Sequence, residues 1–185
     1  MQLVLIGIQG AGKSTQGNLL SKKYDIPYLS SGHIFRQMAQ SKTALGRWVK
    51  ETINAGYLIP DDKTVEIVME YLKRPEYKNG FILDGFPRTV PQAKAFEAFT
   101  KGDEIVILID VSDKEALWRI SGRLDIREDE TLKAIRKRID LFHNKTSQVL
   151  DYYAERKHLA VVNGEQEVEA VFKDITEKIE QISAK

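Results

Sequence analysis

The first sixteen residues constrain the fold most, because the apolar run QLVLI at 2–6 stops at a glycine-rich turn that leads into GKST at 12–15. Glycines at 7, 10 and 12 let backbone N–H groups curl inward around an anion, and a helix beginning near Lys13 adds the positive end of its dipole. Residues 7–14 fit the pattern G-x-x-x-x-G-K-[ST] between a strand and a helix, the context that this motif requires. The segment predicts a loop that holds nucleotide phosphates, with Lys13 on the outer phosphates and the Ser14 hydroxyl on Mg²⁺.

The rest of the chain alternates short apolar runs with longer amphipathic ones. The apolar runs at 2–6, 27–29, 81–83, 104–109 and 159–162 predict strands. Helical patterns occupy 13–24, a broken region at about 34–72, and then 91–99, 114–123, 128–155 and 168–182. This alternation predicts the three-layer α/β fold of P-loop NTPases, a five-stranded parallel sheet flanked by helices. Chemistry is expected in the loops after residues 6, 29, 83 and 109, because ligands of such sheets bind at the carboxyl ends of strands.

Composition narrows the class of protein further. The 185 residues suffice for one domain with a sizeable core, and 28 Lys and Arg against 27 Asp and Glu leave a net charge of +1. This near balance argues against nucleic acid or a membrane surface as a partner. The chain has no cysteine, so disulfides and cysteine-bound zinc are excluded and no zinc is expected. The first apolar run is too short for a signal peptide or a membrane span, and we expect a soluble, cytoplasmic protein.

A second polar segment, DGFPRT at 84–89, follows the apolar run at 81–83. Asp84 stands where the predicted strand ends, and a carboxylate at that place can hold Mg²⁺ through water. Gly85 and Pro87 shape a turn that presents Arg88 into the same crevice. Taken alone, Asp84 is equally a strand-end turn former and Arg88 a solvated cation, so the segment gains meaning only beside the phosphate loop.

Together these segments resemble a known family. The loop GIQGAGKST, the pair Ser31-Gly32 with Arg36 four residues later, and DGFPRT followed by Gln92 resemble the adenylate kinases, in the right order over almost the whole chain. The resemblance implies the Mg²⁺-dependent reaction ATP + AMP = 2 ADP, with ATP, AMP and ADP as ligands of one domain. It also implies a core at 1–29, 60–122 and 128–185, a mobile helical AMP-binding segment at 30–59, and a vestigial lid at 123–127.

The resemblance assigns residues to each ligand. The residues implied for ATP are Gly10, Ala11, Gly12, Lys13, Ser14, Thr15, Arg119, Arg123 and Gln166, the last in the loop 163–166 through backbone atoms. The residues implied for AMP are Ser31, Arg36, Tyr57, Leu58, Ile59, Gly85, Phe86, Pro87, Arg88, Gln92, Arg127 and Arg138. Ser14 and, through water, Asp84 are implied for Mg²⁺. The implied catalytic set is Lys13, Arg88, Arg123, Arg127 and Arg138.

The spacing of the arginines in the second half fits this assignment. Arg119 and Arg123 are four residues apart and share a face of a predicted helix. Arg127 and Arg138 are eleven apart, about three helical turns, and share a face if one helix carries both. The alternative is an exposed basic helix paired with the acidic residues at 128–130. Four arginines at the spacing of the family, with two more at 36 and 88, favour the catalytic interpretation.

The sequence departs from the family in three places. Ser14 stands where members usually carry glycine, and His33 stands where an acidic residue is common. Either Ser14 gains a direct metal contact while Asp84 becomes the main carboxylate, or Ser14 caps the helix and His33 points to solvent. Only three residues separate Arg123 from Arg127, where members carry a longer lid. A missing lid predicts ATP hydrolysis without AMP, unless a second copy in a homo-oligomer covers the site, to which Trp48 or Trp118 could contribute.

Other functions compete with this one. A kinase for UMP or CMP shares most of the motifs, but Thr89 and Gln92 favour adenylate, whereas Ser31 in place of the usual threonine is a mild caution. A small-metabolite kinase would use Asp84 as its base. A nucleotide-dependent switch or binding module would need no arginine set, and the chain lacks an N-K-x-D motif for reading a guanine base.

Overall fold

The computed structural model describes residues 1–122 and 131–183. Its centre is a five-stranded sheet in the order β2-β3-β1-β4-β5, in which each neighbouring pair is parallel. The strands are β1 Gln2–Ile6, β2 Tyr28–Ser30, β3 Phe81–Asp84, β4 Glu104–Asp110 and β5 Leu159–Asn163. The predicted α/β class, the strand number and the parallel pairing are confirmed.

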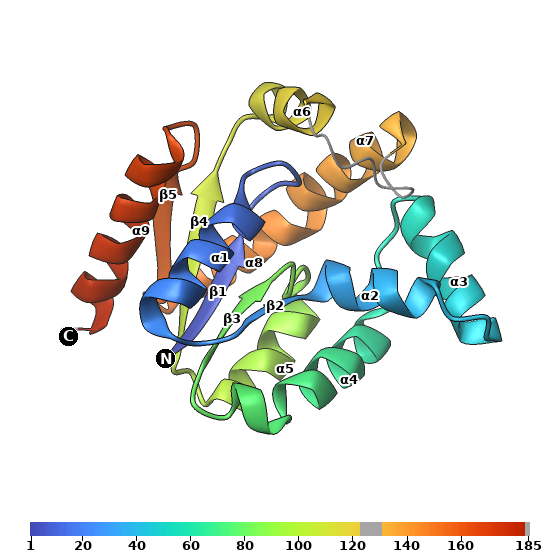
Figure 1. Ribbon diagram of the computed structural model, residues 1–185, viewed down its shortest axis with the longest axis horizontal. Coiled ribbons are helices and arrows are strands. Elements are labelled where there is room, and N and C mark those ends of the chain that lie inside the picture. The colour runs from blue at the N-terminus through green and yellow to red at the C-terminus, as the bar shows by residue number, and fades with distance from the viewer. Residues whose placement is uncertain (123–130, 184–185) are drawn as a thin grey trace.

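Helices cover both faces of the sheet (Figure 1). The α-helices of the described residues are α1 Lys13–Tyr24, α2 Ser31–Ala39, α3 Ala44–Asn54, α4 Asp61–Leu72, α5 Val90–Thr100, α6 Asp113–Ser121, α7 Leu132–Leu141, α8 Ser147–Glu155 and α9 Val168–Ser183. A 3₁₀ turn, η1, lies at Pro75–Tyr77, and a π-helical turn, η2 at Phe142–Thr146, joins α7 to α8. The described residues contain no helix that is long and apolar enough to cross a membrane.

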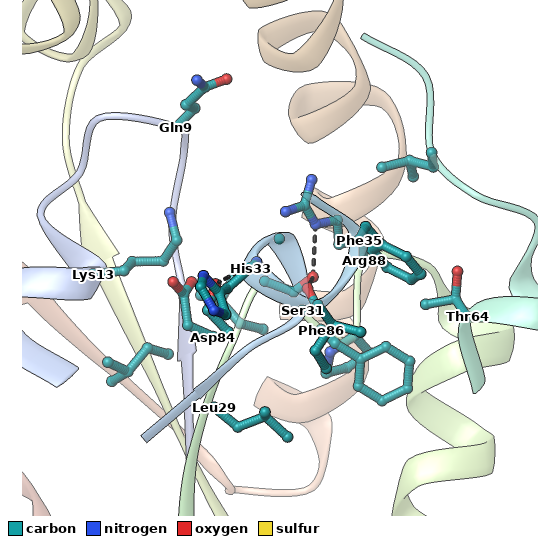
Figure 2. A pocket seen from close by; sticks show the side chains of 18 of the residues that line it. Gln9, Lys13, Leu29, Ser31, His33, Phe35, Thr64, Asp84, Phe86 and Arg88 are labelled. Carbon is teal, nitrogen blue, oxygen red and sulfur yellow. Dashed lines mark hydrogen bonds between the residues drawn. The ribbon is translucent and has the colours of Figure 1, made fainter. Parts of the chain in front are cut away.

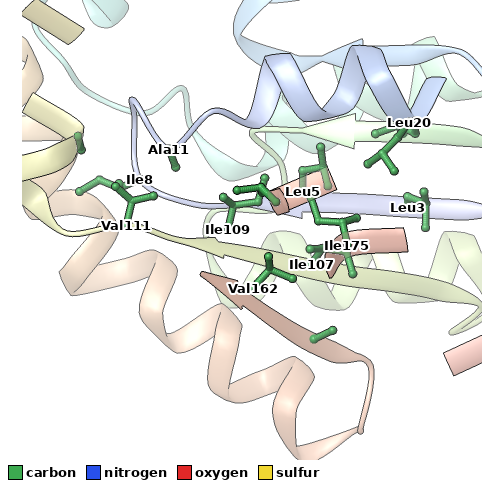
Figure 3. Close-up of a cluster of buried hydrophobic side chains, with 14 of the residues drawn as sticks. Leu3, Leu5, Ile8, Ala11, Leu20, Ile107, Ile109, Val111, Val162 and Ile175 are labelled. Carbon is green, nitrogen blue, oxygen red and sulfur yellow. The ribbon is translucent and has the colours of Figure 1, made fainter. Parts of the chain in front are cut away.

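The central strands β1, β3 and β4 are largely apolar because both of their faces are buried. Side chains alternate along a strand, so Leu3 and Leu5 face one core while Val4 and Ile6 face the other. Helices α1, α6, α7 and α9 close the first core, part of which is drawn in Figure 3. Helices α4, α5 and α8 close the second, with α2 at its edge. A single pattern of buried residues therefore fixes both faces of the sheet.

The broken helical pattern at about 34–72 resolves into three helices. Thr43 ends the first break, because its hydroxyl accepts a hydrogen bond from the Gly46 backbone N–H at 3.0 Å and caps α3. Helices α2 and α3 project away from the sheet (Figure 1) and share a small core of their own, formed by Phe35, Val49 and Ile59. We call α2, α3 and the turn that follows, residues 31–59, the acceptor arm, after the role that the resemblance of the motifs implies for residues 30–59.

The strand order places a crevice above β1. The connection from β1 runs through α1 to one edge of the sheet, whereas the connection from β3 crosses β1 to reach β4 on its other side. Connections that leave adjacent strands in opposite directions open a crevice at the carboxyl ends of those strands. Three of the four predicted loops, those after β1, β2 and β3, meet at this crevice, whereas the loop after β4 contributes no residue to the lining of the cavity there.

Candidate active site

A cavity of about 630 Å³ occupies the crevice. It is lined by the phosphate loop after β1, by α2 and the turn after α3, by the loop after β3, and by α7. In Figure 2, Gln9 and Lys13 lie on the side of the phosphate loop, Thr64 lies on the opposite side, and Asp84, Ser31 and Arg88 lie between. One cavity thus brings together two of the motifs that are 70 residues or more apart in the sequence, the loop at 7–14 and DGFPRT at 84–89.

The phosphate loop packs so tightly that its glycines are required. A Cβ on Gly7 would lie 2.7 Å from the Ile109 carbonyl oxygen, and one on Gly10 would lie 2.6 Å from the Ala116 carbonyl oxygen. Gly10 and Gly12 also have φ angles of 94° and 89°, in the left-handed region that favours glycine. The Lys13 ammonium donates to the Gly7 and Ile8 carbonyl oxygens at 2.8 and 2.9 Å, so it folds over the loop. The loop is a preformed cradle with its cation in place.

Ser14 is the second residue of α1, whereas the N-cap of this helix is Gly12. No side chain caps that end, so the alternative in which Ser14 merely caps the helix is wrong. The Ser14 side chain is exposed and lines the cavity, and His33 is exposed at the same cavity. Ser14 is therefore available to a ligand of the loop.

Asp84 is the last residue of β3 and is buried, with 8% of its surface exposed. Its Oδ2 accepts a hydrogen bond of 2.7 Å from the Tyr28 hydroxyl, whereas its buried Oδ1 has no hydrogen-bond partner among the described residues. Burial and the neighbouring carboxylate raise the pKa of Tyr28, so its hydroxyl remains a donor at physiological pH. An unpaired carboxylate oxygen on the cavity that Ser14 also lines fits a site for Mg²⁺.

Arg88 is held by the turn that carries it. Its Nε donates to the Gly85 carbonyl oxygen at 2.7 Å, its backbone N–H donates to Gln92 Oε1 at 2.8 Å, and its carbonyl accepts from the Thr146 hydroxyl at 3.1 Å. Gly85 permits this turn with a φ angle of 79°. Ser31 of α2 donates to the same Gly85 carbonyl at 2.8 Å, which joins the acceptor arm to the turn.

Three arginines from different elements converge on the cavity. Burial lowers the pKa of Arg88, Asp84 opposes this effect, and the charges of Arg138 and Arg36 lower the pKa further. The Arg138 guanidinium donates to Gln9 Oε1 of the phosphate loop at 3.2 Å and to the Ile53 carbonyl oxygen of the acceptor arm at 2.8 Å. Cations that destabilise one another in this way favour an anionic ligand such as a phosphate group.

The other predicted residues divide between the cavity and its surroundings. Tyr57, Leu58, Ile59, Phe86, Pro87 and Gln92 line the cavity. The Gln92 amide also donates to Asp61 Oδ1 at 2.7 Å, so this carboxylate and the Arg88 backbone fix its orientation.

Four residues predicted for ATP do not line the cavity, namely Ala11, Thr15, Arg119 and Gln166. Arg119 lies beside the loop and pairs with Glu115 at 2.7 Å, while the Gln166 amide donates to Asp174 at 2.7 Å. Arg123 and Arg127 lie outside the described residues.

Four residues that organise the site lie outside the set predicted from the sequence. Tyr28 holds Asp84, Gln9 contacts Arg138, Asp61 orients Gln92, and Thr146 contacts the turn of Arg88. Tyr28 reads as an ordinary aromatic strand residue, and Thr146 and Asp61 lie in helical patterns outside every motif. Only Gln9, inside the phosphate loop, carried a signal by its position.

Fold and site together define a P-loop protein of the α/β class with a second, arginine-lined pocket beside its phosphate loop. Residues 5–158 match the family model described as adenylate kinase. The chain is 36% identical to an adenylate kinase of Clostridium novyi, covering 97% of this chain and 99% of that protein. It is 35% identical to one of Caldicellulosiruptor bescii (95% and 97% covered) and 36% identical to one of Azobacteroides pseudotrichonymphae (98% of both).

The chain belongs to the adenylate kinase family. It is an enzyme, a phosphotransferase of the reaction ATP + AMP = 2 ADP, as the resemblance of its motifs implied.

The close packing of the phosphate loop can be tested with Gly10→Ala. The added methyl group meets the α6 backbone, so we expect a larger loss in free energy of unfolding than the about 1–2 kcal/mol that a left-handed backbone alone costs. Gly102→Ala is the matched control, because Gly102 also has a positive φ but its nearest neighbour lies 3.8 Å from the added Cβ. Urea unfolding measures both variants, and equal losses would show that the contact with α6 is unimportant.

Proposed function

We propose that the phosphate loop holds the ATP phosphates and that the arginine-lined cavity holds AMP, so that the γ-phosphoryl group passes between them. The observation that carries this proposal is the convergence of Arg36, Arg88 and Arg138 with Asp84 on one cavity beside Lys13. The charge that develops on the transferred phosphoryl oxygens is stabilised by fixed cations, and catalysis consists of positioning and electrostatics. Arg123 and Arg127 join this set on the basis of the sequence.

The acceptor in this reaction needs no general base, because it is already an anionic phosphate oxygen. Asp84 accepts a hydrogen bond from the Tyr28 hydroxyl and interacts electrostatically with the Arg88 guanidinium, so it already serves as an acceptor and as a counter-charge. A kinase acting on a hydroxyl group would instead need a base at this place. We therefore assign Asp84 to Mg²⁺ rather than to proton transfer.

For the acceptor base we propose Ser31, Gln92 and the backbone at 57–59, all of which line the cavity. The fixed amide of Gln92 suits one pattern of donors and acceptors on the base, and we propose that adenine matches it better than uracil or cytosine. Initial rates with AMP, UMP and CMP test this preference, and equal rates would contradict it. Residues 30–59 are proposed to move as a unit, for which the separate core of the acceptor arm is the physical basis.

Mg²⁺ accompanies nucleotides throughout this family, and the chain offers the Ser14 hydroxyl and the Asp84 carboxylate to it. When bound, the ion neutralises charge on the β- and γ-phosphates. We expect no zinc, since the chain has no cysteine and its described residues hold no group of three His, Asp or Glu able to bind a metal ion. A cytoplasmic location stays a prediction of the sequence.

Arg88→Ala tests the acceptor site. The variant removes a cation that faces the acceptor phosphate, so we expect kcat/KM for AMP to fall by about 10²–10³-fold while ATP affinity changes little. Arg156→Ala is the control, because Arg156 is likewise an arginine held by polar contacts, here an ion pair with Glu97 at 3.1 Å, but it lies at the C-cap of α8 and does not line the cavity. Turnover at the wild-type level in Arg88→Ala would refute the assignment.

Ser14→Gly tests the metal role of the serine. Loss of a direct ligand should raise the Mg²⁺ concentration needed for half-maximal activity. Ser14→Ala should give the same increase while retaining helix propensity, which separates the hydroxyl from the backbone effect of glycine. An unchanged Mg²⁺ requirement in both variants would contradict the proposal that Ser14 binds the ion.

The sequence places only three residues between Arg123 and Arg127, and we infer from this short segment that ATP is hydrolysed without AMP, because a donor site without a long lid would admit water. The alignment with the Clostridium novyi protein spans 213 positions against the 185 residues of this chain, which supports a missing segment. The 69% exposed Trp118 offers an apolar surface for a second copy that covers the site. Hydrolysis rates and sedimentation together test both ideas: a monomer that hydrolyses ATP no faster than a longer relative would contradict them.

A further inference from the structure

Tyr28 occupies a place that is made for it. It is the first residue of β2, and its ring lies between α1 and the end of β3. A Cβ on Gly17 of α1 would lie only 2.4 Å from Cε2 of the Tyr28 ring. A glycine inside a helix costs stability relative to alanine, and here it makes room for the ring. The ring is thus locked between a helix backbone and the β3 terminus.

This locked ring delivers its hydroxyl to one oxygen of Asp84. The hydroxyl donates to Oδ2 at 2.7 Å, and the other oxygen, Oδ1, is left buried and without a partner in the described part of the chain. A carboxylate on a short side chain can rotate, and a charged hydrogen bond to one oxygen stops that rotation. The consequence is a single oxygen with a fixed direction.

Asp84 is the only carboxylate among the described residues that line the cavity. The position after Ser31-Gly32, where the family commonly has an acid, is His33, and residues 1–122 and 131–183 contain no cluster of three His, Asp or Glu suited to a metal ion. A single carboxylate that acts on the metal through water has no neighbouring carboxylate to compensate for a change in its orientation. Its geometry then depends on whatever fixes its side chain.

We propose that Tyr28 is a positioning residue for Asp84, which sets the carboxylate so that Oδ1 supports the hydration shell of the Mg²⁺ bound to ATP. The proposal rests on the assignment of Asp84 to Mg²⁺ made above. It names a second contact behind the metal ligand, of the kind that typically changes metal affinity or activity by about 10–100-fold when removed.

The rival interpretation is that Tyr28 is only an aromatic residue of the core. A second tyrosine in the same region, Tyr24, allows the two interpretations to be compared. Tyr24, four residues earlier at the end of α1, also packs against the first core. Its hydroxyl is buried and makes no hydrogen bond among the described residues. Packing a tyrosine ring at this end of α1 therefore does not require a partner for its hydroxyl, whereas the Tyr28 hydroxyl has one that lines the cavity.

The experiment measures Mn²⁺ binding to the enzyme–ATP complex by electron paramagnetic resonance, which reports the metal directly rather than through turnover. Tyr28→Phe removes only the hydroxyl, and we expect Mn²⁺ affinity to fall by about tenfold. Tyr24→Phe is the matched control and should bind Mn²⁺ like the wild type. Steady-state kinetics should show a raised Mg²⁺ requirement in Tyr28→Phe with the KM for AMP unchanged.

A double variant distinguishes the metal role of Asp84 from the positioning role of Tyr28. If Tyr28 acts through Asp84, then Tyr28→Phe has no further effect on Mn²⁺ affinity in an Asp84→Asn background. An unchanged affinity in Asp84→Asn alone would refute the metal role of Asp84. A loss in Asp84→Asn together with wild-type affinity in Tyr28→Phe would refute the positioning role and leave the proposed function intact.

Gly17→Ala provides an independent variant in case Tyr28→Phe folds poorly. The added methyl group displaces the ring while the hydroxyl is retained, so a lower Mn²⁺ affinity is expected here too. Wild-type Mn²⁺ affinity in Gly17→Ala, from a protein in which the ring is shown by NMR to have moved, would overturn the proposal.

Discussion

The structure depends on a close backbone contact between the phosphate loop and the elements beside it. Gly7 packs closely against the Ile109 carbonyl oxygen near the end of β4, and Gly10 packs closely against the Ala116 carbonyl oxygen of α6. These contacts place the loop above the centre of the sheet, at the point where the connections diverge to both edges. The cavity, the adjacent arginines and the start of α1 all take their positions from this packed turn.

Charge is the second organising quantity. The cavity gathers three guanidinium groups from α2, the loop after β3 and α7, and the buried Asp84 opposes the repulsion of Arg88 by the other two. Hydrogen bonds to carbonyl and amide oxygens hold two of these cations in place, Arg88 at Gly85 and Arg138 between Gln9 and Ile53. Cations that are fixed close to one another favour an anionic group such as phosphate. They also need little reorganisation when negative charge develops on the transferred group.

Much of the fold followed from local pattern. Strands buried on both faces read as uninterrupted apolar runs, and the alternation with helices left one architecture. Element ends were less certain: the pattern at 128–155 did not reveal the π-helical turn at Phe142–Thr146, because such a turn depends on how two helix segments pack rather than on propensity. The motifs and the arginine spacing also identified the charged residues that line the cavity in the described part of the chain, Lys13, Arg36, Asp84, Arg88 and Arg138, since that chemistry is carried by residue types at fixed spacing.

The sequence by itself determined the phosphate loop, the sheet and the family of reactions, because each is carried by contiguous residues whose backbone needs are local. Only the tertiary structure decided which side chains support them. Tyr28 and Asp84 are 56 residues apart, and Gln9 and Arg138 are 129 apart, so no local pattern links either pair. Their contacts exist because the parallel sheet brings the loop after β1 and the end of β3 to one edge, where side chains from β2 and α7 reach them.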